Sequence, residues 1–209
     1  MLCVASSANS EEMTMPAALR TTRAAWIEAG LSALGSAGPD AVRVEPVAAQ
    51  LGVTKGGFYR HFADRNAFLS ALLDEWERRS VDEVIARVEA DEADAATNVR
   101  RAGTLTFAKD LLPIDLAVRA WARSDSQVAV RLRRVDNARI GYLRSQFATI
   151  TGDRGEVEAR SMLAFALAIG QHFITAEHAE FGRTQALNLA AAFLTAPPGE
   201  RPVLPTSRD

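Results

Sequence analysis

The chain has 209 residues, of which 48% are hydrophobic and 24% are charged, so it can bury a sizeable core. Its formal net charge of −2 at pH 7 argues, taken alone, against a nucleic-acid partner. The single cysteine, Cys3, excludes an intrachain disulfide and a zinc site built from cysteines. Alternating apolar and polar segments typical of strands are scarce, so we expect an all-α protein.

The location of the charges matters more than their sum. Between Pro16 and Arg65, six basic residues outnumber four acidic ones, although the chain as a whole is slightly acidic. A local basic excess is typical of a surface that meets phosphate groups. DNA therefore remains a possible partner of the N-terminal part.

The sequence has few signs of export or membrane insertion. Its N-terminus lacks the basic stretch and the long apolar core of a signal peptide. The richest apolar run, Met162–Gly170, is far shorter than the roughly 20 residues that cross a bilayer. We therefore expect a cytoplasmic protein.

The N-terminal part predicts a disordered arm and three helices. Residues 1–15 are small and polar, and we expect them to be disordered. Apolar residues then recur every three or four positions through about Ala17–Ser36, which predicts a helix that ends before Gly38. A second helix is expected to begin near Val44, and a third to cover Lys55–Phe62.

The most informative stretch is Val47–Phe62, with the sequence VAAQLGVTKGGFYRHF. Gly52 can adopt the left-handed conformation that ends a helix, and Thr54 is a suitable N-cap for the next one. Phe58 and Phe62 are four residues apart, so both are expected to enter the core. Two short helices joined by a glycine turn, the second rich in hydrogen-bond donors, form a helix-turn-helix pattern.

The rest of the chain predicts further helices, for about nine in all. Asp64 is a good N-cap for a helix that runs towards Val88. Residues 197–209 begin with Pro-Pro-Gly and predict a disordered tail. The other helices are expected at Ala95–Lys109, Pro113–Trp121, Asp125–Phe147, Glu156–His178 and Arg183–Thr195.

A family pattern runs without a gap from about Thr22 to Phe68. It consists of a Thr-Arg opening, the pairs Trp26-Ile27 and Val47-Ala48, the run Gly52-Val53-Thr54-Lys55-Gly56, and the pairs Phe58-Tyr59 and His61-Phe62. This pattern resembles the TetR family of transcriptional regulators, whereas the C-terminal two thirds match it only in the number and lengths of helices. The resemblance implies an N-terminal three-helix helix-turn-helix DNA-binding domain, residues 16–63, and a C-terminal helical effector-binding and dimerisation domain, residues 64–196.

The resemblance also implies which residues contact DNA. Family members often open the second helix with Thr or Ser, where this chain has Val42 and Arg43, and an arginine there can reach a phosphate. Tyr59 and His61 are expected to donate to phosphates, and Arg60 to contact a guanine; the alternative is that Tyr59 and Arg60 are ordinary solvated residues. The expected DNA contacts are Arg43, Thr54, Lys55, Gly56, Tyr59, Arg60, His61 and Arg65.

A homodimer is the next implication. The last two helices are apolar over more than one face, as expected of helices buried on two sides. The alternative is a core formed wholly within one subunit. The expected dimer contacts are Met162, Phe165, Ala166, Ile169, Phe173, Leu187, Ala190 and Phe193.

In the family, a small effector binds among the C-terminal helices and shifts the fourth helix. The candidate pocket residues are Trp76, Phe107, Trp121, Phe165, His172 and Phe173, with an ordinary core position as the alternative for each. His172 and His178 are six residues apart, unlike the metal-binding pairs of helices, so we expect no metal and no other cofactor.

These expectations together describe a sequence-specific DNA-binding transcriptional regulator. We expect a repressor that acts as a homodimer on a palindromic operator and is released by a small molecule. An activator or a ligand-independent regulator of the same fold is the alternative, as is a helical module that has lost DNA binding. A small all-α enzyme is more remote, because the sequence offers no nucleophile–base set, phosphate-binding loop or ligand cluster.

Overall fold

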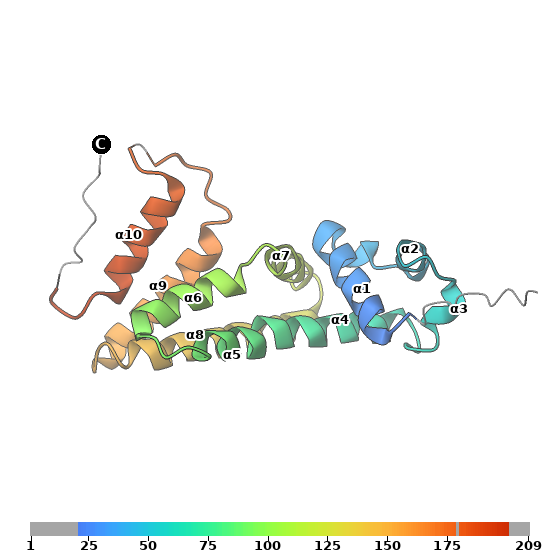
Figure 1. The fold of residues 1–209 in the computed structure, drawn as a ribbon, viewed down its shortest axis with the longest axis horizontal. Coiled ribbons are helices and arrows are strands. Elements are labelled where there is room, and N and C mark those ends of the chain that lie inside the picture. Colours follow the sequence, from blue (N-terminus) through green and yellow to red (C-terminus); the bar gives the residue numbers. More distant parts are fainter. Residues whose placement is uncertain (1–20, 179, 201–209) are drawn as a thin grey trace, which may run out of the picture.

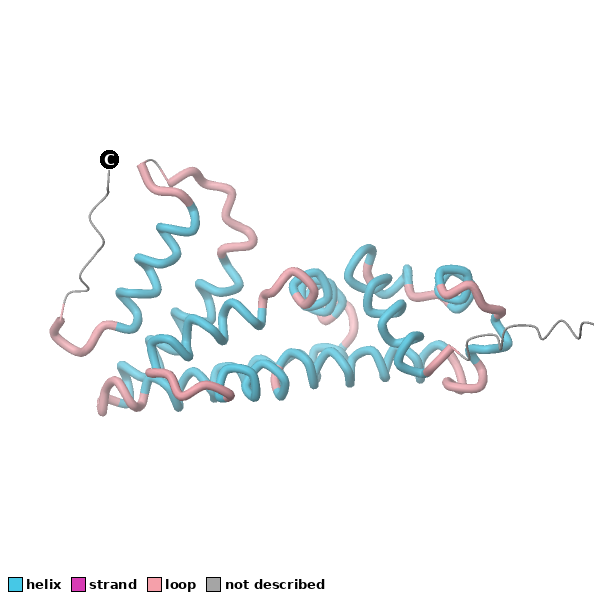
Figure 2. The backbone as a smooth tube through the Cα atoms, viewed as in Figure 1, coloured by secondary structure: helices cyan, strands magenta, loops and turns pink. Residues whose placement is uncertain are grey.

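The computed structural model describes residues 21–178 and 180–200. Over these residues the chain forms α-helices and one short 3-10 helix, with no strand (Figures 1 and 2), which confirms the all-α class. The elements are α1 (Arg23–Ala37), η1 (Pro39–Ala41), α2 (Val44–Gln50), α3 (Lys55–Phe58), α4 (Arg65–Ser80), α5 (Asp82–Glu89), α6 (Ala95–Thr106), α7 (Leu112–Trp121), α8 (Ser126–Phe147), α9 (Arg154–Gly170) and α10 (Arg183–Thr195).

The molecule is elongated, with α3 at one end of its long axis and α9 and α10 at the other (Figure 1). Between these ends, α4 and α8 run along the long axis. No helix in the described part of the chain is both long and apolar enough to cross a membrane.

The first helix begins at Arg23 because the side chain of Thr22 caps it, accepting a hydrogen bond from the backbone N–H of Ala25 at 3.1 Å. The expected start at Ala17, the arm of residues 1–15 and residues 201–209 of the tail lie outside the described residues.

The third helix is shorter than expected. Helical geometry ends at Phe58, whose carbonyl accepts hydrogen bonds from the backbone N–H groups of His61 (2.9 Å) and Phe62 (3.1 Å). Thr54 has the extended backbone of an N-cap, but its side chain makes no capping bond. Gly56 and Gly57 have low helix propensity, so the segment closes as a single turn that carries both phenylalanines inward.

The fourth expected helix is divided in two. Asp64 caps its start as expected, accepting from the backbone N–H of Ala67 at 2.8 Å. At Val81 the backbone leaves helical geometry, with φ −122° and ψ −71°, and α5 begins one residue later. Because of this break, the described residues form one α-helix more than the nine expected.

The expected helix Glu156–His178 is wrong beyond Gly170. Asp153 caps α9, accepting from the backbone N–H of Glu156 at 2.7 Å, but after Gly170 the chain leaves the helix through a turn. Glycine is a poor helix former, and the β-branched pair Ile174-Thr175 that follows does not restart a helix. Phe173 and His178 therefore lie in a loop.

One aromatic cluster holds the N-terminal helices to α4. The Phe58 ring lies 5.4 Å from Trp26 and 5.3 Å from Phe68, and the Phe62 ring lies 4.7 Å from Phe68. All four side chains are buried, which confirms that Phe58 and Phe62 are core residues. The same core continues along α4 and reaches α7 and α8.

The close approach of α1 to α4 depends on a residue without a side chain. A Cβ added at Gly30 would lie 2.5 Å from Cζ of Phe68 and 2.8 Å from Cδ2 of Leu72. Both neighbours are fully buried, so neither can move freely.

We predict that Gly30→Ala destabilises the protein. Alanine would gain up to about 1 kcal/mol in helix propensity, but overpacking against Phe68 and Leu72 costs about 1–3 kcal/mol. Urea unfolding should show a net loss. The control is Gly141→Ala in α8, where an added Cβ meets nothing within 4 Å and stability should rise. Equal gains in both variants would contradict the packing argument.

Candidate functional site

The α2–turn–α3 unit is the first candidate site. Gly52 has φ 67°, the left-handed conformation expected of it, and the backbone N–H of Val53 bonds to the carbonyl of Ala48 at 3.0 Å. These two features end α2 and redirect the chain into α3. On the inner side, Val47 and Ala48 are buried against the core.

This unit lies at one end of the molecule (Figure 1), and its outer side carries exposed hydrogen-bond donors. Six of the eight expected DNA contacts are exposed there, and the Tyr59 side chain is 55% exposed. These six residues are Arg43, Thr54, Lys55, Gly56, Tyr59 and Arg60.

Lys55 already has an acidic neighbour. Its Nζ lies 2.5 Å from Oε1 of Glu45 on α2, and both side chains are exposed. The hydrogen bond to Lys55 lowers the pKa of Glu45, and the same bond raises the pKa of Lys55. Lys55 therefore stays cationic, but a phosphate must compete with Glu45 for it.

Gly56 and Gly57 are not required by internal packing. A Cβ on Gly56 would meet only Oγ1 of Thr54 at 3.7 Å, and one on Gly57 only Cζ2 of Trp26 at 3.8 Å. These are ordinary contact distances. The lack of a side chain at the exposed Gly56 leaves the backbone of α3 open to the close approach of another molecule.

His61 and Arg65 are placed differently from the other six. The His61 ring Nε2 lies 2.8 Å from the carbonyl oxygen of Thr21. Arg65 donates from Nε to the carbonyl of Val42 at 2.7 Å and from Nη2 to that of Pro39 at 2.6 Å. Arg65 thus holds the η1 loop against the start of α4, with most of its donor edge turned inward.

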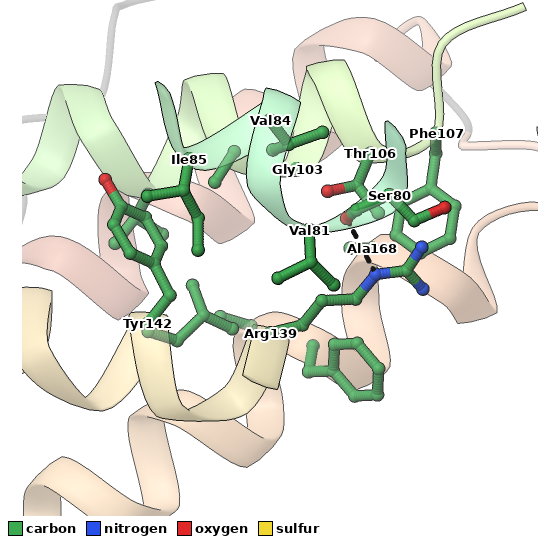
Figure 3. Close-up of a pocket in the computed structure, with 15 residues that line it drawn as sticks. Ser80, Val81, Val84, Ile85, Gly103, Thr106, Phe107, Arg139, Tyr142 and Ala168 are labelled. Carbon is green, nitrogen blue, oxygen red and sulfur yellow. Dashed lines mark hydrogen bonds between the residues drawn. The ribbon is translucent and has the colours of Figure 1, made fainter. Parts of the chain in front are cut away.

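A second candidate site is a cavity among the C-terminal helices (Figure 3). It holds about 520 Å³ of empty space, its open mouth included, between the α4–α5 junction, α6, α8 and α9. Its wall is mostly apolar, with Ser80, Thr106, Arg139 and Tyr142 as the polar members. An outer cavity opens beside it towards α10 and holds about 1050 Å³ of empty space, its open mouth included. The two cavities share Val99, Gly103, Phe107, Ala164 and Ala168.

A network of four charges borders the inner cavity. The fully buried carboxylate of Asp115 accepts from Nη1 of Arg139 at 2.9 Å and from Nε of Arg119 at 2.7 Å. Arg119 also binds Asp136 through two bonds, at 2.7 and 3.0 Å. Arg139 is buried, and this burial lowers its pKa although Asp115 lies beside it.

The expected pocket residues divide into two groups. Phe107 and Phe165 line the inner cavity, and His172 joins Phe107 in the wall of the outer one, with ring centres 5.6 Å apart. Burial lowers the pKa of His172. Trp76 and Trp121 instead pack in or against the main core. Phe173 is 66% exposed in the loop after α9 and lines neither cavity.

The expected dimer contacts lie on or near an exposed apolar surface. Met162 and Phe193 are 55% and 58% exposed, and Ala166 is also exposed. The half-buried members are Phe165, Ile169, Leu187 and Ala190. Phe165, expected both in the pocket and at the dimer contact, lines the inner cavity.

Sequence reasoning missed the polar residues of the inner cavity. Arg139 lies four residues after Val135 and four before Leu143, both buried, so it interrupts the apolar face of α8. Asp115 interrupts the apolar face of α7 in the same way, next to buried Ile114. The sequence did contain a signal, because a charged residue at a core position of a helix needs a charged or polar partner and so indicates a buried polar site.

The N-terminal helices and their exposed donors define a helix-turn-helix protein, the class that places its second short helix in the major groove of DNA. Residues 27–72 match the family model described as bacterial regulatory proteins, tetR family. The chain thus carries the TetR-family N-terminal domain. A search of curated protein sequences found no match to the chain.

Solved structures with the same fold include TetR-family regulators. A TetR-family transcriptional regulator from Rhodococcus sp. is 22% identical, with 83% of this chain and 98% of that chain covered and a TM-score of 0.58. AibR in complex with isovaleryl coenzyme A and operator DNA is 14% identical (84% and 98% covered, TM-score 0.61). FadR from Bacillus subtilis in complex with stearoyl-CoA is 15% identical (84% and 98% covered, TM-score 0.62).

We predict that Arg65→Lys destabilises the N-terminal helices. A lysine has a single donor nitrogen and cannot reproduce the separate Nε and Nη2 atoms that bind the carbonyls of Val42 and Pro39, and losing a charged hydrogen bond costs about 1–3 kcal/mol. Urea unfolding should report this loss, while the exposed Arg60→Lys should change stability by less than about 0.5 kcal/mol. Equal stability of the two variants would mean that the two carbonyl bonds contribute nothing.

Proposed function

We propose that this protein is a sequence-specific transcriptional repressor that binds a palindromic DNA operator as a homodimer and is released by a small molecule. The observation that carries the proposal is the exposed donor surface of α3, which stands on a core of four aromatic rings. The donors of this segment face outward because its apolar residues, Phe58 and Phe62, are buried in the core.

The DNA contacts are assigned by what each exposed group can reach. Arg43, Thr54, Lys55 and Tyr59 donate to phosphates on either side of the major groove, which sets affinity and register. Arg60 contacts a guanine edge through two hydrogen bonds. His61 and Arg65 act mainly by holding the segments before α1 and around η1, since both already bond to backbone carbonyls.

The proposed dimer forms through an exposed apolar surface on α9 and α10. Met162, Leu163 and Phe193 are each more than half exposed, and large exposed side chains grouped on neighbouring helices are typical of an interface. A helix-turn-helix head on each subunit then reads one half-site. The interface lies at the end of the molecule away from α3 (Figure 1).

The inner cavity is the proposed effector site. It borders the α4–α5 junction, while the first residue of α4 binds the η1 loop of the DNA-binding head. An effector can release DNA only if it binds the two states with different affinity. Two proteins of similar fold were solved with small ligands, AibR with isovaleryl coenzyme A and operator DNA and FadR with stearoyl-CoA, which supports a small-molecule effector for this protein.

The proposal is tested by selecting binding sites from a random duplex library. We predict that the wild-type protein selects two symmetric half-sites and that Arg60→Ala loses the preference at one base pair in each. The expected loss of discrimination is about 1–3 kcal/mol per half-site.

Arg154→Ala is the matched control for this selection. Arg154 is exposed at the start of α9, at the opposite end of the molecule from α3 (Figure 1), so the selected sequence should not change. A uniform loss of affinity in Arg60→Ala would reassign Arg60 to a phosphate. Failure of the wild type to select any duplex at low salt would end the DNA-binding proposal.

We further predict that the double variant Met162→Glu/Phe193→Glu is monomeric in sedimentation velocity. Burying two carboxylates per subunit costs more free energy than the apolar contact of the interface contributes. Val130→Glu is the control, because Val130 is 50% exposed on α8 and outside the proposed interface. Dimers of unchanged affinity in the double variant would place the interface elsewhere.

A further inference from the structure

The inner cavity gathers the unpartnered polar atoms of its surroundings. Six buried side-chain atoms of the described residues have no hydrogen-bond partner, and three of them are Nη2 of Arg139, Oγ of Ser80 and Oη of Tyr142. All three side chains belong to the wall of this one cavity, and each residue is at least nine-tenths buried. Buried polar groups in folded proteins are almost always paired, so three around one cavity indicate a missing ligand group.

The chemistry of these atoms defines what is missing. A guanidinium N–H can only donate, and both hydroxyls can donate as well. Nη2 of Arg139 therefore needs an acceptor on the ligand, and an oxygen acceptor can also receive a hydrogen bond from a hydroxyl. The rest of the wall is mainly apolar, with Val81 and Ile85 lying between the Tyr142 ring and the Arg139 guanidinium (Figure 3).

The geometry at the Arg139 end favours two acceptor oxygens on one group. Nη1 of Arg139 already binds Asp115, and Nε points to the backbone carbonyl of Ser80 at 3.4 Å, so Nη2 remains available. The Ser80 side chain comes from the same residue whose carbonyl faces Nε. A carboxylate can place one oxygen on Nη2 and the other on the Ser80 hydroxyl.

The charge of Arg139 supports an anion. Arg139 shares Asp115 with Arg119, since each arginine binds a different oxygen of that carboxylate, and the second carboxylate, Asp136, binds Arg119 directly and lies 3.8 Å from Nη1 of Arg139. Neither carboxylate forms a bond with Nη2 of Arg139. The Phe107 ring covers the guanidinium at 5.7 Å, which limits solvent around it. A charge-assisted bond in such surroundings is stronger than one in water.

We propose that the effector is a small, mainly apolar monocarboxylate whose carboxylate binds Arg139 and Ser80 in the inner cavity. Its apolar body lies along Val81 and Ile85 and can extend past Gly103 into the outer cavity. The effector role rests on the proposed function, whereas binding to the cavity does not and is measured without DNA.

The test uses hexanoate, hexanamide and hexylamine as probes of one length and three charges. Isothermal titration calorimetry with the full chain should show hexanoate binding at least about tenfold more tightly than hexanamide, because a charged hydrogen bond is replaced by a neutral one. Hexylamine should not bind, because its ammonium group would be repelled by the guanidinium of Arg139. Equal affinity for the three probes, or no binding of hexanoate, overturns the proposal.

Two variants test the site without removing the buried charge. Ser80→Ala deletes a hydroxyl that has no partner in the free protein, so thermal stability should not fall while hexanoate affinity falls about tenfold. Gly103→Leu places a side chain between the two cavities and should abolish binding. Its matched control is Gly141→Leu, which faces open space on α8 and should bind like the wild type. Unchanged affinity in Ser80→Ala and Gly103→Leu places the ligand elsewhere.

A DNA-release measurement separates the two proposals. If hexanoate binds with this variant pattern but the protein selects no duplex, the repressor proposal fails and the carboxylate site stands. If DNA is bound and hexanoate binds without weakening it, the cavity is a carboxylate site but not the effector site. Release of DNA by hexanoate that Ser80→Ala reduces supports the whole inference.

Discussion

The structure depends most on the packing of α1 and α3 against α4. Gly30 allows α1 to approach closely, and the rings of Trp26, Phe58, Phe62 and Phe68 fill the space between these helices. The short α3 has too few residues to be stable alone. Its exposed donors are therefore presented only because its two phenylalanines are fixed in the common core.

The C-terminal part uses a different means of fixing its helices. Asp115 on α7 joins Arg119 on its own helix to Arg139 on α8, and Arg139 reaches the last carbonyl of α4. Ion pairs buried in this way add little net stability, but breaking one is costly. The network therefore sets the relative positions of α4, α7 and α8 around the cavity more than it strengthens the fold.

The sequence predicts the parts of the structure that depend on local signals. The cap at Asp64, the start of α8 after Asp125 and the helix end at Gly52 occur where side-chain chemistry places them. The break at Val81 and the end of α9 at Gly170 were not predicted, and a single glycine is a weak signal for the end of a helix. Aromatic residues were poor markers of the cavity, because a large ring fits a closed core as well as a pocket wall. Trp76 and Trp121 fill the core, while the polar residues Ser80, Arg139 and Tyr142 line the cavity.

The two ends of α4 are held by the same kind of bond. At its start the Arg65 guanidinium binds the carbonyls of Pro39 and Val42, and at its end the Arg139 guanidinium faces the carbonyl of Ser80. A helix of 16 residues spans about 24 Å at 1.5 Å per residue. The helix thus joins two guanidinium–carbonyl contacts across its full length. Under the proposed function, a ligand that displaces Arg139 from the Ser80 carbonyl would act at the opposite end of α4 from the helices proposed to bind DNA.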